Sequence, residues 1–305
     1  MYVVELISTN RLLLSGAGKM TQNRLYFGYG SNLDWNDWVQ YCEKKSAHPD
    51  GLREREPAWL VGHHLKFHYH SRGRKGGAAD VVPIDAYHAT PGALFDVNED
   101  AWSTLVAKEG APWYYEEKNV LVIGSDGQLH EAVTFVVCDE KKKPGFQRPT
   151  DVYHDLIHNG LHERGLPTNG LDMAMQHRFD TPTINHLFVY GTLMSGQSRF
   201  TQLEPYVRSQ HQASIRGHLH HLGDYPGMKL GDGVVHGQLM ELENVEACLE
   251  RMDSIEGFLG FGRNDSLFDR TIVQVQTEQG IVWAWTYVYA GDVVDDSIIE
   301  HGRWC

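Results

Sequence analysis

Two glutamates, each followed by glycine, stand at equivalent places in the two halves of this sequence. Glu109 lies in Ala107-Lys108-Glu109-Gly110, and Glu256 lies in Ser254-Ile255-Glu256-Gly257. Each ends an apolar-periodic stretch and could face a cleft, where burial would raise its pKa toward the value that a general acid or base requires. For either residue alone, a solvated carboxylate at a helix end is the simpler interpretation. Recurrence in both halves favours catalysis.

A short apolar segment that ends in Tyr-Gly-(Ser/Thr) precedes each glutamate along the chain. The segments are residues 25–33 (LYFGYGSNL) and 187–193 (LFVYGTL). Backbone N–H groups exposed beside glycines suit a carboxylate or an oxyanion, although an ordinary strand-ending turn is the alternative. Neither segment has the third glycine of a dinucleotide fingerprint, and the chain has no GxxxxGK[ST] phosphate loop.

These landmarks recur in one order, which indicates an internal repeat. Gly92-Ala93-Leu94-Phe95 corresponds to Gly237-Gln238-Leu239-Met240, and each Glu-Gly pair precedes a Val-rich strand, at 115–122 and 268–275. A chance similarity between two β-rich domains is the alternative. Duplication explains the order better.

The elements that must position these residues are mostly strands. Alternating patterns predict strands at 59–69, 133–137, 215–222, 235–242, 271–276 and 282–289, and helices at 99–107, 245–252 and from Thr150 or Asp151 to about 163. Such a pattern argues for α+β halves over a doubly wound sheet. We expect an extension at 1–20, a first domain at 21–170, a linker at 171–185 and a second domain at 186–305, with Met20 as a possible natural start.

Composition limits the classes of function. The 305 residues include 27 basic and 40 acidic side chains, giving a net charge of −13, which argues against nucleic-acid binding and weakly favours a cationic substrate. The separated Cys42, Cys138, Cys248 and Cys305 form no CxxC pair, and no apolar run is long enough to span a bilayer. We therefore expect a cytoplasmic protein without a membrane partner.

Histidine clusters at 63–70 and 218–221 raise a metal-binding alternative. His68 and His70 would share one strand face, as would His218 and His220. No third ligand with a defined spacing accompanies them. Solvated strand histidines are therefore the favoured interpretation.

The first loop, residues 25–33, resembles the substrate loop of γ-glutamylcyclotransferases. Residues 188–194 (FVYGTLM) resemble the same loop in the AIG2-like, γ-glutamylamine branch of that superfamily. The resemblance extends over nearly everything from Met20 onward. The further matching segments are 76–79, 92–95, 109–110, the strand at 115–122, 153–157 and 165–167 in the first half, and 225–227, 237–239, 256–257, 268–270 and 302–304 in the second.

The resemblance implies two tandem small mixed β-barrel domains with flanking helices. It implies that the α-amine of a γ-glutamyl amide or γ-glutamyl amino acid attacks its own γ-carbonyl, releasing 5-oxoproline and a free amine without metal or cofactor. Glu109 and Glu256 would be catalytic, and the backbone from Phe27 to Ser31 would bind the α-carboxylate. The residues implied to contact substrate are Tyr26, Phe27, Gly28, Tyr29, Gly30, Ser31, Asn32, Tyr115, Tyr153, Val189, Tyr190, Gly191, Thr192 and Leu193.

The second half departs from the family pattern. It has Leu193 at the position of Asn32, Phe268 where relatives often have tyrosine, and a glycine-rich loop at 257–266. Three alternatives therefore stay open: a single catalytic repeat beside a binding or structural one, an amide hydrolase that uses the same glutamate, and a metal-binding protein. The leaving amine and the oligomeric state are also open.

Overall fold

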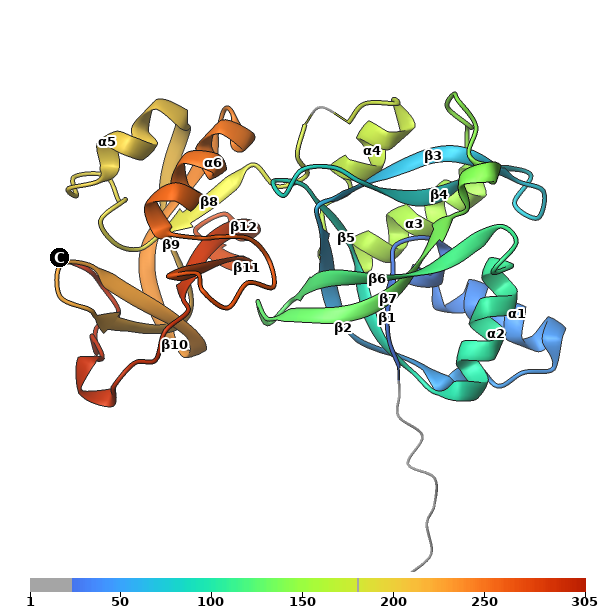
Figure 1. Ribbon diagram of the computed structural model, residues 1–305, viewed down its shortest axis with the longest axis horizontal. Coiled ribbons are helices and arrows are strands. Elements are labelled where there is room, and N and C mark those ends of the chain that lie inside the picture. Colours follow the sequence, from blue (N-terminus) through green and yellow to red (C-terminus); the bar gives the residue numbers. More distant parts are fainter. Residues whose placement is uncertain (1–23, 180) are drawn as a thin grey trace, which may run out of the picture.

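The chain folds into two β-barrels that lie side by side (Figure 1). The computed structural model describes residues 24–179 and 181–305, so the expected extension at 1–20 and the possible start at Met20 lie outside the described residues. Each barrel is closed by five strands and flanked by helices. The predicted α+β fold with two tandem small barrels is confirmed.

The first barrel closes through one parallel contact. Its neighbouring strands pair antiparallel, except that β1 runs parallel to β7 where Tyr26 pairs with Val133. In order around the barrel, the strands are β1 (Arg24–Gly28), β5 (Ala89–Val97), β2 (Leu52–Val61), β6 (Tyr115–Gly124) and β7 (Leu129–Val137).

The second barrel repeats this order. Here β8 runs parallel to β12 where Leu187 pairs with Trp285, and the other neighbours pair antiparallel. In the corresponding order, the strands are β8 (His186–Val189), β10 (Pro226–Leu242), β9 (Val207–His221), β11 (Phe268–Thr277) and β12 (Gly280–Tyr289).

Buried hydrogen bonds also recur at equivalent positions. The Tyr29 hydroxyl donates to the Phe135 carbonyl at 2.5 Å, and the Tyr190 hydroxyl donates to the Tyr287 carbonyl at 2.8 Å. These bonds tie the end of β1 to β7 and the end of β8 to β12. A second repeated pair is donated by threonine hydroxyls: Thr134 to the Phe27 carbonyl at 2.8 Å, and Thr286 to the Phe188 carbonyl at 3.0 Å.

The two glutamates end equivalent helices, α2 (Glu99–Glu109) and α6 (Val245–Glu256). Asn98 and Asn244 cap the N-termini through side-chain oxygens that accept backbone N–H bonds. Gly110 and Gly257 end the helices with φ of 68° and 66°, a left-handed conformation that favours glycine. The Glu-Gly pairs are therefore helix-terminating signals as well as candidate chemistry.

One predicted strand was wrong. Residues 59–69 are not continuous, because Gly62 turns the chain with φ of 68° between β2 and β3 (His63–Ser71). Strand β3 pairs with β4 (Gly76–Pro83) in a hairpin that has no counterpart in the second barrel. The remaining helices are α1 (Trp35–Lys45), α3 (Asp151–Glu163), α4 (Asn169–Met175) and α5 (Phe200–Leu203).

Helix α4 spans the expected boundary between the first domain and the linker at 170/171, so the division into domains stays a prediction. No helix within 24–179 or 181–305 is both long and apolar enough to cross a membrane.

Direct contacts join the barrels. Trp59 and Trp283 meet edge to face at 5.6 Å between ring centroids, and Trp283 Nε1 donates to the Gly165 carbonyl at 2.8 Å. The fully buried Arg270 donates to the Ala86 carbonyl at 2.7 Å. The second barrel thus packs on the first through hydrogen bonds and aromatic contacts.

Candidate active sites

The Glu109 carboxylate is held by Asn32. Asn32 Nδ2 lies 2.7 Å from Glu109 Oε1 and 2.8 Å from the Tyr26 hydroxyl, while Asn32 Oδ1 accepts from Lys108 Nζ at 2.5 Å. The amide thus has partners on both sides. Its position is fixed by the loop after β1, and it fixes the carboxylate in turn.

Lys108, which donates to Asn32, belongs to a network of charged side chains. Asp37, in the first turn of α1, forms ion pairs with Lys108 at 2.9 Å and with Arg74 at 2.6 Å. Arg74 also donates to Ser31 Oγ at 2.8 Å. Burial alone would raise the pKa of Asp37, but hydrogen bonds from Arg74 and the charge of Lys108 hold this pKa well below its ordinary value. Asp37 therefore stays ionised and anchors both cations.

The pKa values of Glu109 and Lys108 shift toward each other. Burial raises the pKa of Glu109, against the opposing effects of the Lys108 charge and the Asn32 hydrogen bond. Burial lowers the pKa of Lys108, although Asp37 and Glu109 counteract it. A carboxyl with a raised pKa exchanges protons more readily near neutral pH than an ordinary glutamate does.

Most of the expected first-half residues surround Glu109, but two do not. A small cavity around Glu109 is lined by seven of them: Tyr26, Tyr29, Gly30, Ser31, Asn32, Tyr115 and Tyr153. Glu109, Ser31, Tyr115 and Tyr153 also line a larger cleft of about 650 Å³. Phe27 and Gly28 are absent from the lining. The Phe27 side chain is fully buried in the barrel, where its ring stacks with Tyr29.

Two tyrosines are fixed by one backbone unit of β4. The Tyr115 hydroxyl donates to the Ala79 carbonyl at 2.8 Å, and the Tyr153 hydroxyl accepts from the Ala79 N–H at 3.2 Å. Burial raises the pKa of Tyr153 to about 12, so its hydroxyl keeps its proton. With its acceptor role taken by Ala79, Tyr153 can donate that proton into the cavity.

The second barrel forms an equivalent cavity around Glu256. All five expected second-half residues line it: Val189, Tyr190, Gly191, Thr192 and Leu193. Arg199, Tyr225 and Phe268 lie in the same lining, and the cavity volume is about 100 Å³. The structure thus places each glutamate beside the strand-ending loop of its own barrel.

Glu256 lies in a more apolar setting than Glu109. Leu193 and Ile255 stand where the first barrel has Asn32 and Lys108, and no side chain described in the structure donates a hydrogen bond to Glu256. Burial raises the pKa of Glu256 to about 7, partly offset by the charge of Arg199. This carboxyl therefore holds its proton to a higher pH than an ordinary glutamate does.

The histidine clusters do not assemble a metal site. His68 is buried and lies 2.6 Å from Asp80, whereas His70 is exposed. His218 pairs with Asp232, and His220 pairs with Ser297. Within 24–179 and 181–305, none of these histidines belongs to a trio of side chains close enough to share one ion.

Comparison with known proteins identifies the family. Residues 187–305 match the family model described as γ-glutamyl cyclotransferase, AIG2-like. The γ-L-glutamyl-butirosin B γ-glutamyl cyclotransferase of Niallia circulans is 38% identical over 108 residues, which are 35% of this chain and 68% of that protein. The chain belongs to the γ-glutamyl cyclotransferase family. The family protein ytfP of Citrobacter rodentium is also similar, at 30% identity over 118 residues, 39% of this chain and 93% of the relative.

Solved structures also match parts of this family member, with TM-scores below 0.5. The match to a γ-glutamyl cyclotransferase structure covers 50% of this chain and 86% of the solved chain, with 21% sequence identity and a TM-score of 0.41. The match to YkqA from Bacillus subtilis covers 88% of this chain and 84% of the YkqA chain, with 17% sequence identity and a TM-score of 0.36.

Sequence reasoning missed four charged residues at the sites of this cyclotransferase-family chain: Asp37, Arg74, Lys108 and Arg199. Lys108 is adjacent to the candidate Glu109 in the sequence, but the side to which its side chain points depends on how α2 is rotated against the barrel. Arg74 comes from the β3–β4 hairpin, which the second half lacks. A comparison of the repeats therefore gave no signal for Arg74.

Proposed function

We propose that the protein is a γ-glutamyl cyclotransferase that converts a γ-glutamyl amide into 5-oxoproline and a free amine. A new bond forms between the α-nitrogen and the γ-carbon, and the γ-carbon's bond to the leaving nitrogen breaks. The α-ammonium loses two protons in all, and the leaving nitrogen gains two as it departs as an ammonium. One carboxyl that carries protons in both directions therefore suffices for the chemistry.

In this mechanism Glu109 or Glu256 carries the proton. The carboxylate accepts one proton from the α-ammonium, and the freed amine attacks the γ-carbon. The resulting carboxylic acid returns that proton to the leaving nitrogen, and the same carboxyl then carries the second proton from the α-nitrogen to the departing amine. Holding the glutamyl chain in a near-attack conformation contributes roughly 7–11 kcal/mol as effective molarity. Backbone N–H groups of the loop after β1 or β8 would bind the α-carboxylate and stabilise charge on the γ-oxygen.

One observation carries this proposal. A single carboxyl with a raised pKa ends an equivalent helix in both barrels and shares a cavity with an equivalent strand-ending loop. Asn32 would position Glu109, and Tyr153 would donate a hydrogen bond to the substrate. The substrate is a small molecule, and we place the enzyme in the cytoplasm.

The test is product identity across a panel of γ-glutamyl amino acids, amines and peptides. Mass spectrometry should find 5-oxoproline with at least one of them. Free glutamate as the direct product would instead favour amide hydrolysis. Product formation that one glutamate variant abolishes would assign catalysis to a single barrel.

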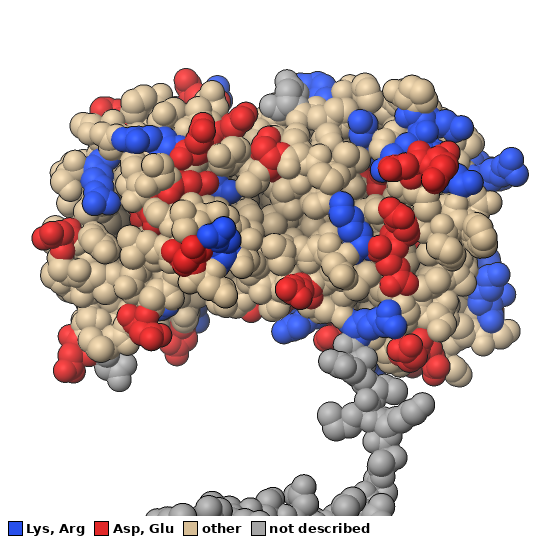
Figure 2. All heavy atoms as spheres, viewed as in Figure 1, with Lys and Arg blue, Asp and Glu red and all other residues tan. Residues whose placement is uncertain are grey.

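The two sites differ in charge and therefore in the leaving group that each would accept. The first cleft is lined by Arg72, Arg74, Lys108, Lys141 and Lys143 against two acids, Glu109 and Glu140. Basic side chains are also more frequent over the first barrel in the view of Figure 2, where it lies to the right. Asp37 pairs with Arg74 and Lys108 behind this lining, but the basic side chains still outnumber the acids. The site is therefore locally positive in a chain of net charge −13, which favours an anionic leaving group there.

A matched substrate pair tests this preference. γ-Glutamyl-alanine and γ-glutamyl-ethylamide differ only in the carboxylate of the leaving group. In a chain carrying Glu256→Gln, kcat/KM should favour the alanine compound by about fivefold at low salt, since exposed charge pairs contribute up to about 1 kcal/mol. Arg72→Gln with Lys143→Gln should reduce the ratio, whereas Lys45→Gln, outside the cleft, should not. A preference for the ethylamide would contradict the assignment.

The second site should show a distinct pH profile. In a chain carrying Glu109→Gln, kcat/KM should rise with pH up to about 7, because only the ionised form of Glu256 accepts a proton and burial raises its pKa to about 7. Arg199→Gln should move this midpoint to higher pH, because the arginine charge lowers that pKa. A midpoint near 4.5, the ordinary glutamate value, would contradict a proton carrier whose pKa is raised by burial.

A further inference from the structure

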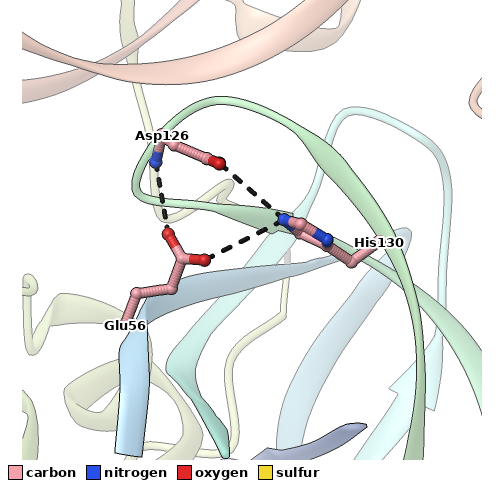
Figure 3. Close-up of side chains that lie close together, drawn as sticks. All are labelled: Glu56, Asp126 and His130. Atoms are coloured by element: carbon pink, nitrogen blue, oxygen red, sulfur yellow. Dashed lines mark hydrogen bonds and ion pairs between the residues drawn. The ribbon is translucent and has the colours of Figure 1, made fainter.

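Three side chains converge at one end of the first barrel, outside both candidate active sites. Figure 3 shows Glu56 from β2, Asp126 from the β6–β7 turn and His130 from β7 pointing toward one another. His130 Nε2 lies 3.9 Å from Glu56 Oε1 and 3.8 Å from Asp126 Oδ1, and the three potential ligand atoms all lie within 4.8 Å of each other. These separations exceed hydrogen-bond length.

Local backbone features create this convergence. The register of β2 on β5 shifts between Glu54 and Glu56, a bulge that redirects the Glu56 side chain. Gly124 ends β6 beside it, and a Cβ there would lie 2.8 Å from both Glu56 Oε2 and Asp126 Oδ1. Because glycine has no Cβ, the two carboxylates can occupy the space beside Gly124.

The remaining hydrogen bonds fix the trio and leave lone pairs directed inward. Glu56 Oε2 accepts from Ser125 Oγ at 2.9 Å, which leaves Oε1 facing the histidine. Asp126 Oδ1 accepts only one backbone bond, from Gln128 N–H at 2.8 Å. His130 Nε2 is buried and makes no hydrogen bond with any part of the chain that the structure describes. A buried Nε2 without a hydrogen bond therefore lies beside two carboxylate oxygens, one of which, Glu56 Oε1, is also 3.6 Å from Arg55 Nε.

The donor set indicates the kind of cation. One imidazole nitrogen with two carboxylate oxygens suits Zn²⁺ and similar first-row divalent ions, whereas Mg²⁺ and Ca²⁺ favour all-oxygen sites. Tetrahedral zinc with bonds of about 2.0–2.2 Å needs ligand-to-ligand separations of about 3.4 Å. A contraction of about half an ångström would bring His130 Nε2 to that separation from each carboxylate oxygen. Asp126 is half-exposed, which leaves access for the ion and for a water as fourth ligand.

The β6–β7 turn, which carries Asp126, also contacts the second barrel. The Gly127 carbonyl accepts from Thr271 Oγ1 of β11 at 2.6 Å in a buried contact. A Cβ at Gly127 would meet Leu230 of β10 at 2.6 Å. An ion bound one residue away, at Asp126, would fix the turn that forms this contact.

We propose that Glu56, Asp126 and His130 bind a divalent transition-metal ion, with Zn²⁺ as the representative, and that the ion braces the β6–β7 turn against the second barrel. The site is separate from the histidine clusters that the sequence indicated. It is also independent of the proposed cyclotransferase activity.

A competition titration tests the site. The untagged full-length protein is stripped with EDTA and titrated with Zn²⁺ against a chromophoric chelator. One equivalent should bind tightly and raise the melting temperature. His130→Gln and Asp126→Asn should each weaken this equivalent by at least about tenfold and remove the thermal shift, since even outer-sphere changes cost roughly 10–100-fold in metal affinity.

His218→Gln is the matched control, because it removes the imidazole of another His–Asp pair, with His218 Nε2 2.9 Å from Asp232. It should bind Zn²⁺ like the wild type. Circular dichroism of the metal-free variants confirms folding, and Co²⁺ spectra of the half-exposed Asp126→Asn variant report coordination directly. Wild-type affinity in both His130→Gln and Asp126→Asn would overturn the proposal. It would also be overturned if the wild type bound no equivalent more tightly than a chain that carries both substitutions, His130→Gln and Asp126→Asn.

Discussion

Replacing Glu109 by glutamine is expected to lower 5-oxoproline release at the first site by about 10²–10⁴-fold, the usual contribution of a positioned general acid–base group. Glutamine keeps the size of the side chain and an oxygen that accepts from Asn32 Nδ2, whose present distance to Glu109 is 2.7 Å. The change therefore removes proton transfer while the cavity is preserved. The loss should appear mainly in kcat, measured in a chain that already carries Glu256→Gln.

Glu140→Gln is the matched control for Glu109→Gln. Glu140 lines the same cleft but lies outside the cavity that holds Glu109. Its replacement should leave kcat within about twofold of the parent chain, since it removes only a peripheral charge. Equal losses from the two variants would show that the cleft needs negative charge in general, and the assignment of Glu109 as the proton carrier would fail.

Replacing Glu256 by glutamine is expected to lower second-site activity by a similar factor and, at the same time, to stabilise the fold above pH 7. Burial raises the pKa of this carboxyl from its ordinary 4.5 to about 7, so the folded protein holds the proton more tightly than the unfolded chain. Below about pH 4.5 both states are protonated and no penalty exists. Between pH 4.5 and 7 the unfolded chain ionises first, and wild-type stability falls as pH rises.

The variant avoids that penalty, so its free energy of unfolding at pH 8 should exceed that of the wild type by about 1–3 kcal/mol. Urea unfolding at pH 8 and pH 4.5 measures the difference, which should nearly vanish at the lower pH. Glu250→Gln, on the exposed side of α6, is the control and should change stability little at either pH. A variant that is less stable than the wild type at pH 8 would contradict a buried, strained carboxylate.

If Glu256→Gln lowers activity and raises stability, the Glu256 carboxyl is retained for chemistry and not for stability. Glu256 has no hydrogen-bond donor among the described side chains to repay its burial, whereas Asn32 and Lys108 offset the burial of Glu109. The first site therefore has a carboxyl held in one orientation. The second relies on apolar surroundings and the charge of Arg199.

The repeat and its two glutamates could be predicted from the sequence because each landmark has a local physical cause. The Glu-Gly pair marks a helix that ends in a left-handed glycine, and Tyr-Gly-(Ser/Thr) marks the end of a strand. The paired hydroxyl bonds of Tyr29 and Tyr190 could not be predicted, because they reach across each barrel to β7 and β12. Barrel closure alone brings those partners together.

Other features depend on contacts that no spacing encodes. Asp37 and Arg74 reach Lys108 and Ser31 only after α1 and the β3–β4 hairpin pack beside α2. The expectation for Phe27 concerned its backbone, and burial of its side chain in the barrel core follows from packing that spacing alone does not reveal. The trio of Glu56, Asp126 and His130 likewise required a bulge and a turn that periodicity does not reveal.

The central claim is that the substrate's own amine displaces the leaving group, and product analysis in oxygen-18-labelled water tests it most directly. A γ-glutamyl substrate found by panel screening is converted by the wild type and by the double variant Glu109→Gln/Glu256→Gln. We predict unlabelled 5-oxoproline from the wild type and at least about a hundredfold less from the double variant. Labelled glutamate from the wild type, or equal 5-oxoproline release from the double variant, would contradict the account.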